Sequence, residues 1–248
     1  MSNPYFSFKQ FTIRQDKCAM KVCTDSCLFG ALLSGITSFF PDLNFPKPST
    51  KILDIGAGTG LLSLMYAQKN ERAIIDAVEL DDNAAQQAKE NFSASLWTKR
   101  LNVRHTSIQD FSNVHAEKYN LIFSNPPFYE DNLKSKDRQR NLALHSASLQ
   151  LEELFVSVKK LLDTNGVFAV LLPYYRTEQA VFLGKENGLY VQKKIPVKRS
   201  PEQNYFRSIL FFSQNPCTES VSEICIKDDA GNYSKEFTEL LKAFYLNL

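Results

Sequence analysis

The sequence predicts an α/β fold: a seven-stranded, mostly parallel sheet with its last strand antiparallel, helices on both faces and a short N-terminal arm. From about residue 49, short apolar runs alternate with segments of helical periodicity, which is the pattern of βαβ units. Beyond residue 172, two long strand-like runs are joined by only a short polar turn. Such a pair must be antiparallel, because parallel strands need a crossover connection. The third observation is a glycine-rich turn, Gly56 to Gly60, directly after the first strand of the sheet.

Length and composition favour one folded domain of ordinary charge. A chain of 248 residues with 44% hydrophobic and 23% charged residues can bury one large core. We expect a single domain made of an arm and helix (1–48), the central sheet (49–213) and a C-terminal strand and helix (214–248). A net charge of +2 excludes a protein that coats nucleic acid by bulk charge, although it permits a local basic patch.

The cysteines and histidines predict neither a disulfide framework nor a metal site. The five cysteines form no CxxC pair, and the three histidines lie far from them in the sequence. The N-terminus lacks the basic start and apolar run of a signal peptide, and no apolar stretch reaches the ~18 residues of a membrane span. We therefore expect a cytoplasmic protein with no metal and no membrane contact. We expect a monomer, with a dimer as the alternative.

The segment before the sheet predicts an arm, a helix and a connector. Residues 6–13 alternate well enough for a hairpin arm. Thr24 or Asp25 would cap a helix that runs to about Phe40. Residues 41–48, punctuated by prolines, read as a connector.

The parallel part of the sheet is predicted from five strands and three helices. The strands are Lys51–Ile55, Ile74–Glu79, Asn102–Thr106, Tyr119–Ser124 and Val167–Leu172. The helices are Leu61–Lys69, Asp82–Trp97 and Leu149–Leu162. Apolar residues in the last helix recur with a period near 3.6, as expected for one buried helix face.

The remaining elements close the sheet and form a tail. A helix over Glu178–Asn187 is closed by Gly188. The two antiparallel runs are Tyr190–Val197 and Tyr205–Ser213. The tail predicts a strand at Glu223–Asp228, a turn around Gly231 and an amphipathic helix from Lys235 to Leu246.

The segment Asp54-Ile55-Gly56-Ala57-Gly58-Thr59-Gly60 joins a strand to a helix and predicts a ligand-binding loop. Glycines permit tight turns and remove the Cβ atoms that would hold a ligand away. A dinucleotide fingerprint is G-x-G-x-x-G, whereas the spacing here is G-x-G-x-G. The acidic Asp54 suits the ammonium of the methionine part of S-adenosylmethionine (SAM) and suits a pyrophosphate poorly. SAM is therefore the favoured ligand.

Two carboxylates follow the next strands. Glu79 ends the second strand, 19 residues past Gly60, where it would accept hydrogen bonds from both ribose hydroxyls. Asp110 follows the third strand and would accept a hydrogen bond from the adenine amino group. A loop or helix-cap role is the alternative for Asp110.

Asn125-Pro126-Pro127-Phe128 follows the fourth strand and predicts a site for a planar amine. Prolines fix the backbone and lack N–H donors, so carbonyls are left to accept. The Asn125 side-chain oxygen and the Pro126 carbonyl can hold both hydrogens of an exocyclic amine, which orients its lone pair toward a methyl donor. Phe128 offers a face on which a base can stack. We predict that these four residues are catalytic.

Two basic clusters predict contact with RNA. The first lies in the polar segment 129–145, which is either a lid or a solvated loop; its cations are Lys134, Lys136, Arg138 and Arg140. The second lies around the final hairpin and includes Lys198 and Arg199. Charge runs are usually only solvated, but two clusters flanking one pocket favour phosphate contact.

At this point the chain resembles the bacterial tRNA1(Val) (adenine(37)-N6)-methyltransferases, within the class I SAM-dependent methyltransferases of Rossmann-like fold. Besides the two central motifs, the resemblance is carried by Phe11-Thr12-Ile13, Met20-Lys21-Val22-Cys23-Thr24-Asp25, Gly231-Asn232-Tyr233 and Phe244-Tyr245-Leu246. It spans nearly the whole chain. The end motifs are the specific part, because many methyltransferases share the central two.

The resemblance implies methyl transfer from SAM to N6 of the adenosine beside the anticodon of a valine tRNA, with S-adenosyl-L-homocysteine as the product. Its RNA partner would be the anticodon stem-loop. The residues it assigns to SAM binding are Lys21, Thr24, Asp54, Gly56, Gly58, Gly60, Glu79, Asp110 and Asn125. Catalysis falls on Asn125 to Phe128. The chain departs from the family at Cys23 and Ser26, where glycine is frequent, and at Leu144, where arginine is common.

Other functions use the same central motifs. A guanine N2-methyltransferase of ribosomal RNA and a glutamine methyltransferase of a release factor both use Asn-Pro-Pro. The glutamine enzymes usually carry a helical N-terminal domain, and fewer than fifty residues precede this sheet, which disfavours them. The intact Asn125 and Phe128 disfavour a SAM-binding RNA chaperone without catalysis, and the glycine spacing disfavours an NAD-dependent oxidoreductase.

Overall fold

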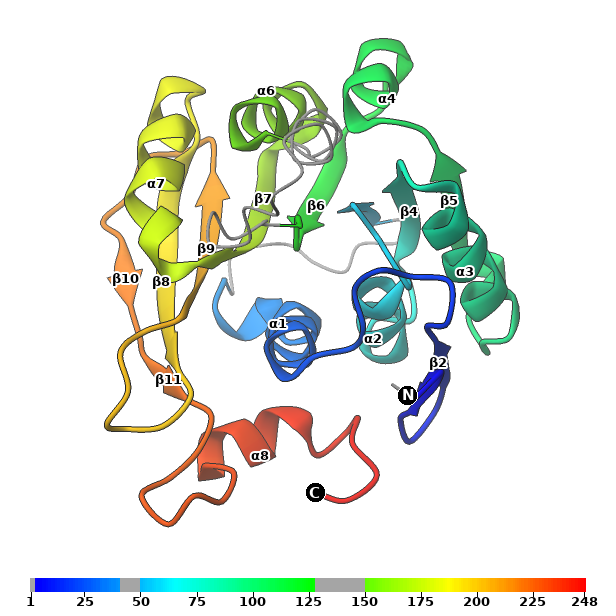
Figure 1. Cartoon of the computed structure of the whole chain (residues 1–248). Helices are drawn as coiled ribbons and strands as arrows, with labels where there is room; N and C mark the ends of the chain where they lie inside the picture. Colours follow the sequence, from blue (N-terminus) through cyan, green and yellow to red (C-terminus); the bar gives the residue numbers. More distant parts are fainter. Residues whose placement is uncertain (1–2, 41–49, 128–149) are drawn as a thin grey trace, which may run out of the picture.

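The structure is a computed structural model that describes residues 3–40, 50–127 and 150–248. Its centre is one mixed β-sheet with helices on both faces (Figure 1). The strands stand in the order β10-β8-β9-β7-β6-β3-β4-β5, and β11 also pairs with β8. They are β3 (Lys51–Ile55), β4 (Ile74–Glu79), β5 (Leu101–His105), β6 (Tyr119–Ser124), β7 (Leu162–Pro173), β8 (Tyr190–Lys198), β9 (Arg207–Ser213), β10 (Ser220–Val221) and β11 (Ile224–Cys225).

The strand pairing confirms the predicted fold class, but in the described residues the sheet has nine strands instead of the predicted seven. Strands β5, β4, β3, β6 and β7 are parallel neighbours, and β9 is antiparallel to both β7 and β8. β8 consequently runs in the same direction as β7. The two short strands β10 and β11 pair in parallel with β8 and extend this edge. They are too short to leave a periodic pattern, and the strand β11 itself covers Ile224–Cys225 of the predicted Glu223–Asp228.

Helices cover both faces of the sheet. They are α1 (Thr24–Ser34), α2 (Leu61–Lys69), α3 (Asp82–Ser93), α4 (Ile108–Val114), α6 (Leu151–Leu161), α7 (Thr177–Glu186) and α8 (Lys235–Leu241). Because alternate strand residues face opposite sides, Leu121 and Phe123 join the cluster with α1 and α2, whereas Ile122 joins the cluster with α4 and α6 (Figure 1). Within the three described stretches, no helix is long and apolar enough to cross a membrane.

The first helix differs from its prediction at both ends. The N-cap is Cys23, and Thr24 is already helical. The helix ends at Ser34, where Gly35 and the 3-10 turn η1 (Ile36–Ser38) follow. The predicted run to Phe40 is therefore wrong, because the apolar pattern continues through a change of helix type. The predicted connector 41–48 lies outside the described residues.

Later helices also differ from the prediction, and α8 ends at Leu241 instead of Leu246. α3 ends at Ser93 instead of Trp97, and the 3-10 turn η2 (Thr98–Arg100) follows before β5. The seven-residue helix α4 was not predicted from its short pattern. Its signal is the N-cap Ser107, whose hydroxyl accepts a hydrogen bond from the Asp110 N–H at 3.0 Å.

The predicted N-terminal arm is the antiparallel pair β1 (Tyr5–Ser7) and β2 (Thr12–Arg14). Asn91 of α3 binds this arm by hydrogen bonds. The Asn91 amide oxygen accepts from the Arg14 N–H at 2.9 Å, and the Asn91 amide nitrogen donates to the Arg14 and Thr59 carbonyls, both at 2.9 Å. The other end of the chain meets the arm where the Lys9 N–H donates to the Phe244 carbonyl at 2.8 Å. Asn91 thus joins the arm directly to the glycine loop.

Candidate functional site

The glycine loop after β3 has the open backbone that its sequence predicts. Gly56, Gly58 and Gly60 have φ values of +71°, +54° and +79°, which favour glycine. A Cβ atom at Gly56 or Gly58 would meet no heavy atom within 4 Å, whereas one at Gly60 would overlap the Phe92 ring. The first two glycines therefore leave room for a ligand against the backbone, and the third lets α3 pack against the loop.

Asp54 lies fully buried at the carboxyl end of β3. Its Oδ2 accepts a hydrogen bond from the Ser63 hydroxyl of α2 at 2.7 Å, while its buried Oδ1 has no hydrogen-bond partner in the structure. Burial, helped by the charge of Glu79, raises the pKa of the Asp54 carboxyl to about 7. An unpaired buried acceptor is costly, so this position favours a ligand that brings a donor or a positive charge.

Glu79, the last residue of β4, makes hydrogen bonds with the loop after β3 and with the turn after β4. Its Oε2 accepts from the Gly58 N–H at 2.8 Å, and its Oε1 accepts from the Asp81 N–H at 2.9 Å. The carboxylate therefore lies against the glycine loop at the end of β4. Each oxygen has a second lone pair that could accept a ribose hydroxyl. The predicted role in ribose binding stays a prediction, and the geometry agrees with it.

Asp110 occupies the first turn of α4, just past β5 at the same edge of the sheet. Its Oδ2 accepts from the Ser107 hydroxyl at 2.7 Å, and its N–H donates to the same hydroxyl at 3.0 Å. The cap of α4 is Ser107, and Asp110 supports that cap from inside the first turn. This contact uses one carboxylate oxygen, so contact with an adenine amino group stays a prediction for the other.

Lys21 and Thr24 lie where β2 leads into α1. The Lys21 ammonium donates to the Gln15 carbonyl, and the Val22 N–H donates to the Gln15 Oε1 at 2.8 Å. The nearby Cys18 thiol is buried, and burial together with the charge of Glu79 raises its pKa to about 11. Cys18, in the segment before α1, therefore lies within electrostatic reach of Glu79, and cofactor binding by Lys21 and Thr24 stays a prediction.

Asn125 follows the end of β6, beside the end of β3. The buried Ser124 hydroxyl donates to the Ile55 carbonyl at 2.8 Å and joins the two strand ends. The Asn125 amide nitrogen donates to the Ser26 hydroxyl of α1 at 3.0 Å, which leaves the amide oxygen to accept another donor. Pro126 is buried and Pro127 half-buried. The other predicted residues of this region, Phe128, Lys134, Lys136, Arg138 and Arg140, lie outside the described residues.

Ser26 is the site residue that sequence reasoning missed as a functional group. Its hydroxyl contacts both Asn125 and the Cys23 thiol, the latter at 2.8 Å. Next to it, Asp25 accepts a hydrogen bond from the Arg207 Nε of β9 at 2.7 Å. Burial opposes ionisation of Asp25, but hydrogen bonds from Cys23 and Arg207 hold its pKa below the usual range. The only sequence signal was the departure from glycine at two positions.

The second basic cluster lies at the end of β8. The Lys198 ammonium is 3.6 Å from a Glu223 carboxylate oxygen and 4.9 Å from the centre of the Tyr205 ring. The Arg199 guanidinium lies 4.3 Å from the centre of the Phe206 ring. Lys198 ends and Arg199 follows a strand that runs parallel to β6 and β7, so they lie at the same edge of the sheet as Asn125.

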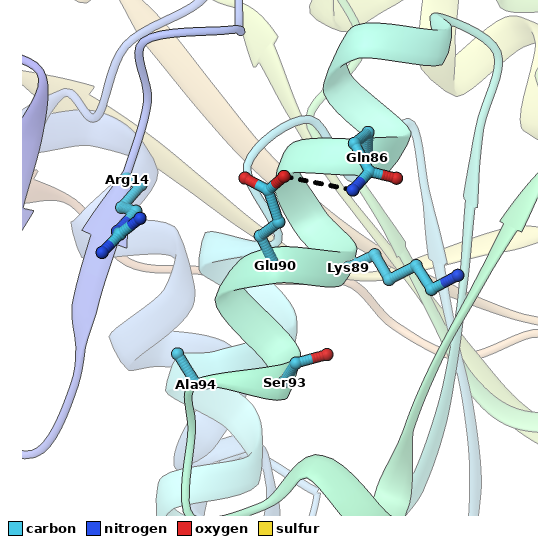
Figure 2. A pocket seen from close by; sticks show the side chains of 6 residues that line it. All are labelled: Arg14, Gln86, Lys89, Glu90, Ser93 and Ala94. Atoms are coloured by element: carbon cyan, nitrogen blue, oxygen red, sulfur yellow. Dashed lines mark hydrogen bonds between the residues drawn. The ribbon is translucent and has the colours of Figure 1, made fainter.

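A pocket of about 430 Å³ lies elsewhere, between the N-terminal arm and α3 (Figure 2). Its lining residues are Arg14, Gln86, Lys89, Glu90, Ser93 and Ala94. Glu90 accepts a hydrogen bond from Gln86 at 3.1 Å and pairs with Lys17 at 2.6 Å. None of the predicted site residues lines this pocket, so we do not assign the cofactor to it. Among the described residues, no three His, Cys, Asp or Glu side chains gather in a way that could hold a metal ion.

Comparisons with known proteins agree on a methyltransferase. A family model for the methyltransferase small domain matches residues 20–171. A curated protein of Flavobacterium psychrophilum named tRNA1(Val) (adenine(37)-N6)-methyltransferase is 42% identical over 98% of this chain and 100% of its own length. A predicted O-methyltransferase of Agrobacterium tumefaciens has a similar fold, with a TM-score of 0.62, 12% identity and coverage of 88% of this chain and 99% of the other. The magnesium protoporphyrin IX methyltransferase of Synechocystis with bound SAM gives a TM-score of 0.51, 13% identity and coverage of 76% and 80%. The chain therefore belongs to the tRNA1(Val) (adenine(37)-N6)-methyltransferase family.

Proposed function

We propose that this protein transfers a methyl group from SAM to the exocyclic N6 of an adenine in tRNA, and that the adenine is A37 of tRNA1(Val), as the name of its relatives states. The observation that carries the proposal is the Asn125 side chain. Its nitrogen donates to the Ser26 hydroxyl, so its oxygen is left to accept a hydrogen bond from an incoming amine. This acceptor stands at the same sheet edge as an open glycine loop and an unpaired buried carboxylate oxygen.

The residues of the loop fit SAM. The open space at Gly56 and Gly58 admits the methionine part against the backbone. The Asp54 Oδ1, which has no hydrogen-bond partner, would bind the ammonium of the methionine part. The Glu79 carboxylate, beside the Gly58 N–H, would accept hydrogen bonds from the ribose hydroxyls. When bound, SAM supplies a methyl group activated by a sulfonium, and the transfer releases S-adenosyl-L-homocysteine and one proton from N6. Asn125 and the backbone would position the amine for this transfer.

The chain's own contribution is to orient and strengthen the nucleophile. An aniline-like N6 shares its lone pair with the adenine ring and is weakly nucleophilic. Hydrogen bonds from N6 to the Asn125 Oδ1 and to the Pro126 carbonyl would turn that lone pair out of the ring plane. Such positioning can supply a large part of a rate enhancement. Phe128 would hold the ring by stacking, a contact worth about 1–3 kcal/mol.

The RNA partner in this proposal is the anticodon stem-loop of tRNA1(Val). Lys198 and Arg199 would contact its phosphates from the end of β8, and the cations of segment 129–145, which lies outside the described residues, are the other predicted phosphate contacts. Each phosphate contact should make the affinity depend on salt, because binding releases counterions.

The test is mass spectrometry of nucleosides after incubation of the protein with SAM and unmodified tRNA. The proposal expects N6-methyladenosine in tRNA1(Val), and none in a transcript whose A37 is replaced by guanosine. Asn125→Ala should abolish transfer while calorimetry shows SAM binding largely intact. Parallel incubations with ribosomal RNA and with protein test the alternatives. Methylation found only in ribosomal RNA or only in protein would reject the adenine assignment in favour of the guanine or glutamine alternative.

A further inference from the structure

Exposed aromatic side chains gather at the edge of the sheet next to the amine site. Tyr174 and Tyr175 begin η3 (Tyr174–Arg176), directly after β7, and they are 40% and 63% exposed. The Tyr205 ring, in the turn between β8 and β9, lies 4.9 Å from the Tyr174 ring, centre to centre, at an interplanar angle of 37°. Large exposed aromatic groups that cluster usually mark a binding surface.

Cations stand among these rings. The Lys198 ammonium lies over the Tyr205 ring, and the Arg199 guanidinium lies over the neighbouring Phe206 ring. Glu223 partly neutralises Lys198 and also accepts a hydrogen bond from the Tyr205 hydroxyl. We name Tyr174, Tyr175, Tyr205, Lys198 and Arg199 the tyrosine surface. Its rings offer flat apolar faces and its cations offer charge within one side-chain length of them.

A continuous path of contacts links this surface to Asn125. The Ser26 hydroxyl accepts a hydrogen bond from the Asn125 amide nitrogen, and Asp25 directly precedes Ser26 in the sequence. The Asp25 carboxylate in turn accepts a hydrogen bond from the Arg207 Nε at 2.7 Å. The Arg207 guanidinium lies 5.4 Å from the centre of the Phe206 ring.

From there, the Phe206 carbonyl accepts a hydrogen bond from the Tyr174 N–H at 3.1 Å. The tyrosine surface therefore begins only a few side chains from the amide that would hold the reacting amine. A ligand that reaches the amine site from solvent on this side would pass over it.

We propose that the tyrosine surface binds the unpaired nucleotides that flank the target adenosine, with bases stacked on Tyr174 and Tyr175 and phosphates beside Lys198 and Arg199. This proposal rests on the proposed function. The chemistry favours single-stranded RNA, since a loop of RNA alternates flat bases with phosphates as the surface alternates rings with cations. A base-paired duplex hides its base faces and could not use the rings.

The experiment compares Tyr175→Ala with Tyr175→Phe and with a matched control, Phe182→Ala. Phe182 is an aromatic residue on α7 with 62% exposure, and Tyr175 is equally exposed, so none of these changes should disturb folding. RNA affinity is measured by fluorescence anisotropy with an anticodon stem-loop oligonucleotide, and SAM affinity by calorimetry. Tyr175→Ala should weaken RNA binding about 5- to 100-fold, as expected for one lost stacking contact. Tyr175→Phe, Phe182→Ala and all SAM affinities should stay within about twofold of the wild type.

Two results would overturn the proposal. One is RNA affinity of the Tyr174→Ala/Tyr175→Ala double variant within about twofold of the wild type. The other is an equal loss in Tyr175→Ala and Tyr175→Phe, which would assign the effect to the hydroxyl and not to stacking. RNA binding is measured separately from methyl transfer. A protein that binds the stem-loop through these tyrosines but makes no N6-methyladenosine would therefore contradict the proposed function and leave the RNA-binding role of the tyrosine surface standing.

Discussion

Asp54 gives the sharpest test of the site, because its surroundings set both the sign and the size of a pH effect. Burial, opposed by the Ser63 hydrogen bond and aided by the charge of Glu79, raises its pKa from 3.8 to about 7. In the unfolded chain the carboxyl loses its proton near pH 4, whereas in the folded protein it keeps the proton up to about pH 7. The folded state binds more protons in this window, so the free energy of unfolding must fall as the pH rises through it.

The size follows from the shift. About three pKa units correspond to about 4 kcal/mol, a contribution fully present below pH 4 and lost above about pH 7. Between about pH 5 and pH 7, roughly 2.3 kcal/mol of it should disappear, because the slope starts at about 1.36 kcal/mol per unit and halves as the carboxyl becomes half ionised. Small proteins are typically stable by only about 5–15 kcal/mol, so a loss of this size is readily measured.

The assay is urea denaturation of the wild type and of Asp54→Asn from pH 5 to pH 8. The variant keeps the size of the side chain but cannot titrate, so the difference between the two proteins removes the contribution of other groups such as Asp25, whose lowered pKa acts with the opposite sign at lower pH. A difference that stays constant within about 0.5 kcal/mol would refute the reasoning. S-adenosyl-L-homocysteine should also raise Tm more at pH 8 than at pH 5 in the wild type, because its ammonium favours the ionised carboxylate.

Other substitutions should separate catalysis, cofactor binding and folding. Ser26→Ala removes the hydrogen-bond partner of the Asn125 amide nitrogen, and one such hydrogen bond is worth about 0.5–1.5 kcal/mol. In steady-state kinetics, kcat should therefore fall about 2- to 10-fold while the KM for SAM is unchanged. An unchanged kcat would contradict this role of Ser26. Gly58→Ala places a Cβ in the open space of the loop, so calorimetry should show SAM binding weakened at least about tenfold; an unchanged Kd would place the cofactor elsewhere. Gly60→Ala should lower the free energy of unfolding by about 2 kcal/mol, since φ there is +79° and the new methyl group would meet Phe92; urea denaturation decides, and a neutral result would mean that the loop relaxes freely.

Secondary structure was predictable where the pattern was long and its ends were marked. α2 (Leu61–Lys69) and β4 (Ile74–Glu79) have the bounds predicted from the sequence, because glycine and polar residues flank a clear apolar run. The end of α1 was not predictable, since η1 continues the same apolar spacing with different hydrogen bonds. The two-residue strands β10 and β11 exist only because β8 offers an open edge to pair with.

The sequence by itself determined the chemistry class of this protein. The glycine loop and the Asn-Pro-Pro motif are runs of adjacent residues, and their backbone properties are set by covalent geometry, whatever lies around them. Only the tertiary structure decided which side chains serve these motifs. Asn125 and Ser26 are 99 positions apart, and Asp25 and Arg207 are 182 apart. Such pairs form when the packing of α1 against the sheet brings the groups together, and no local pattern encodes that packing because it depends on every element of the core.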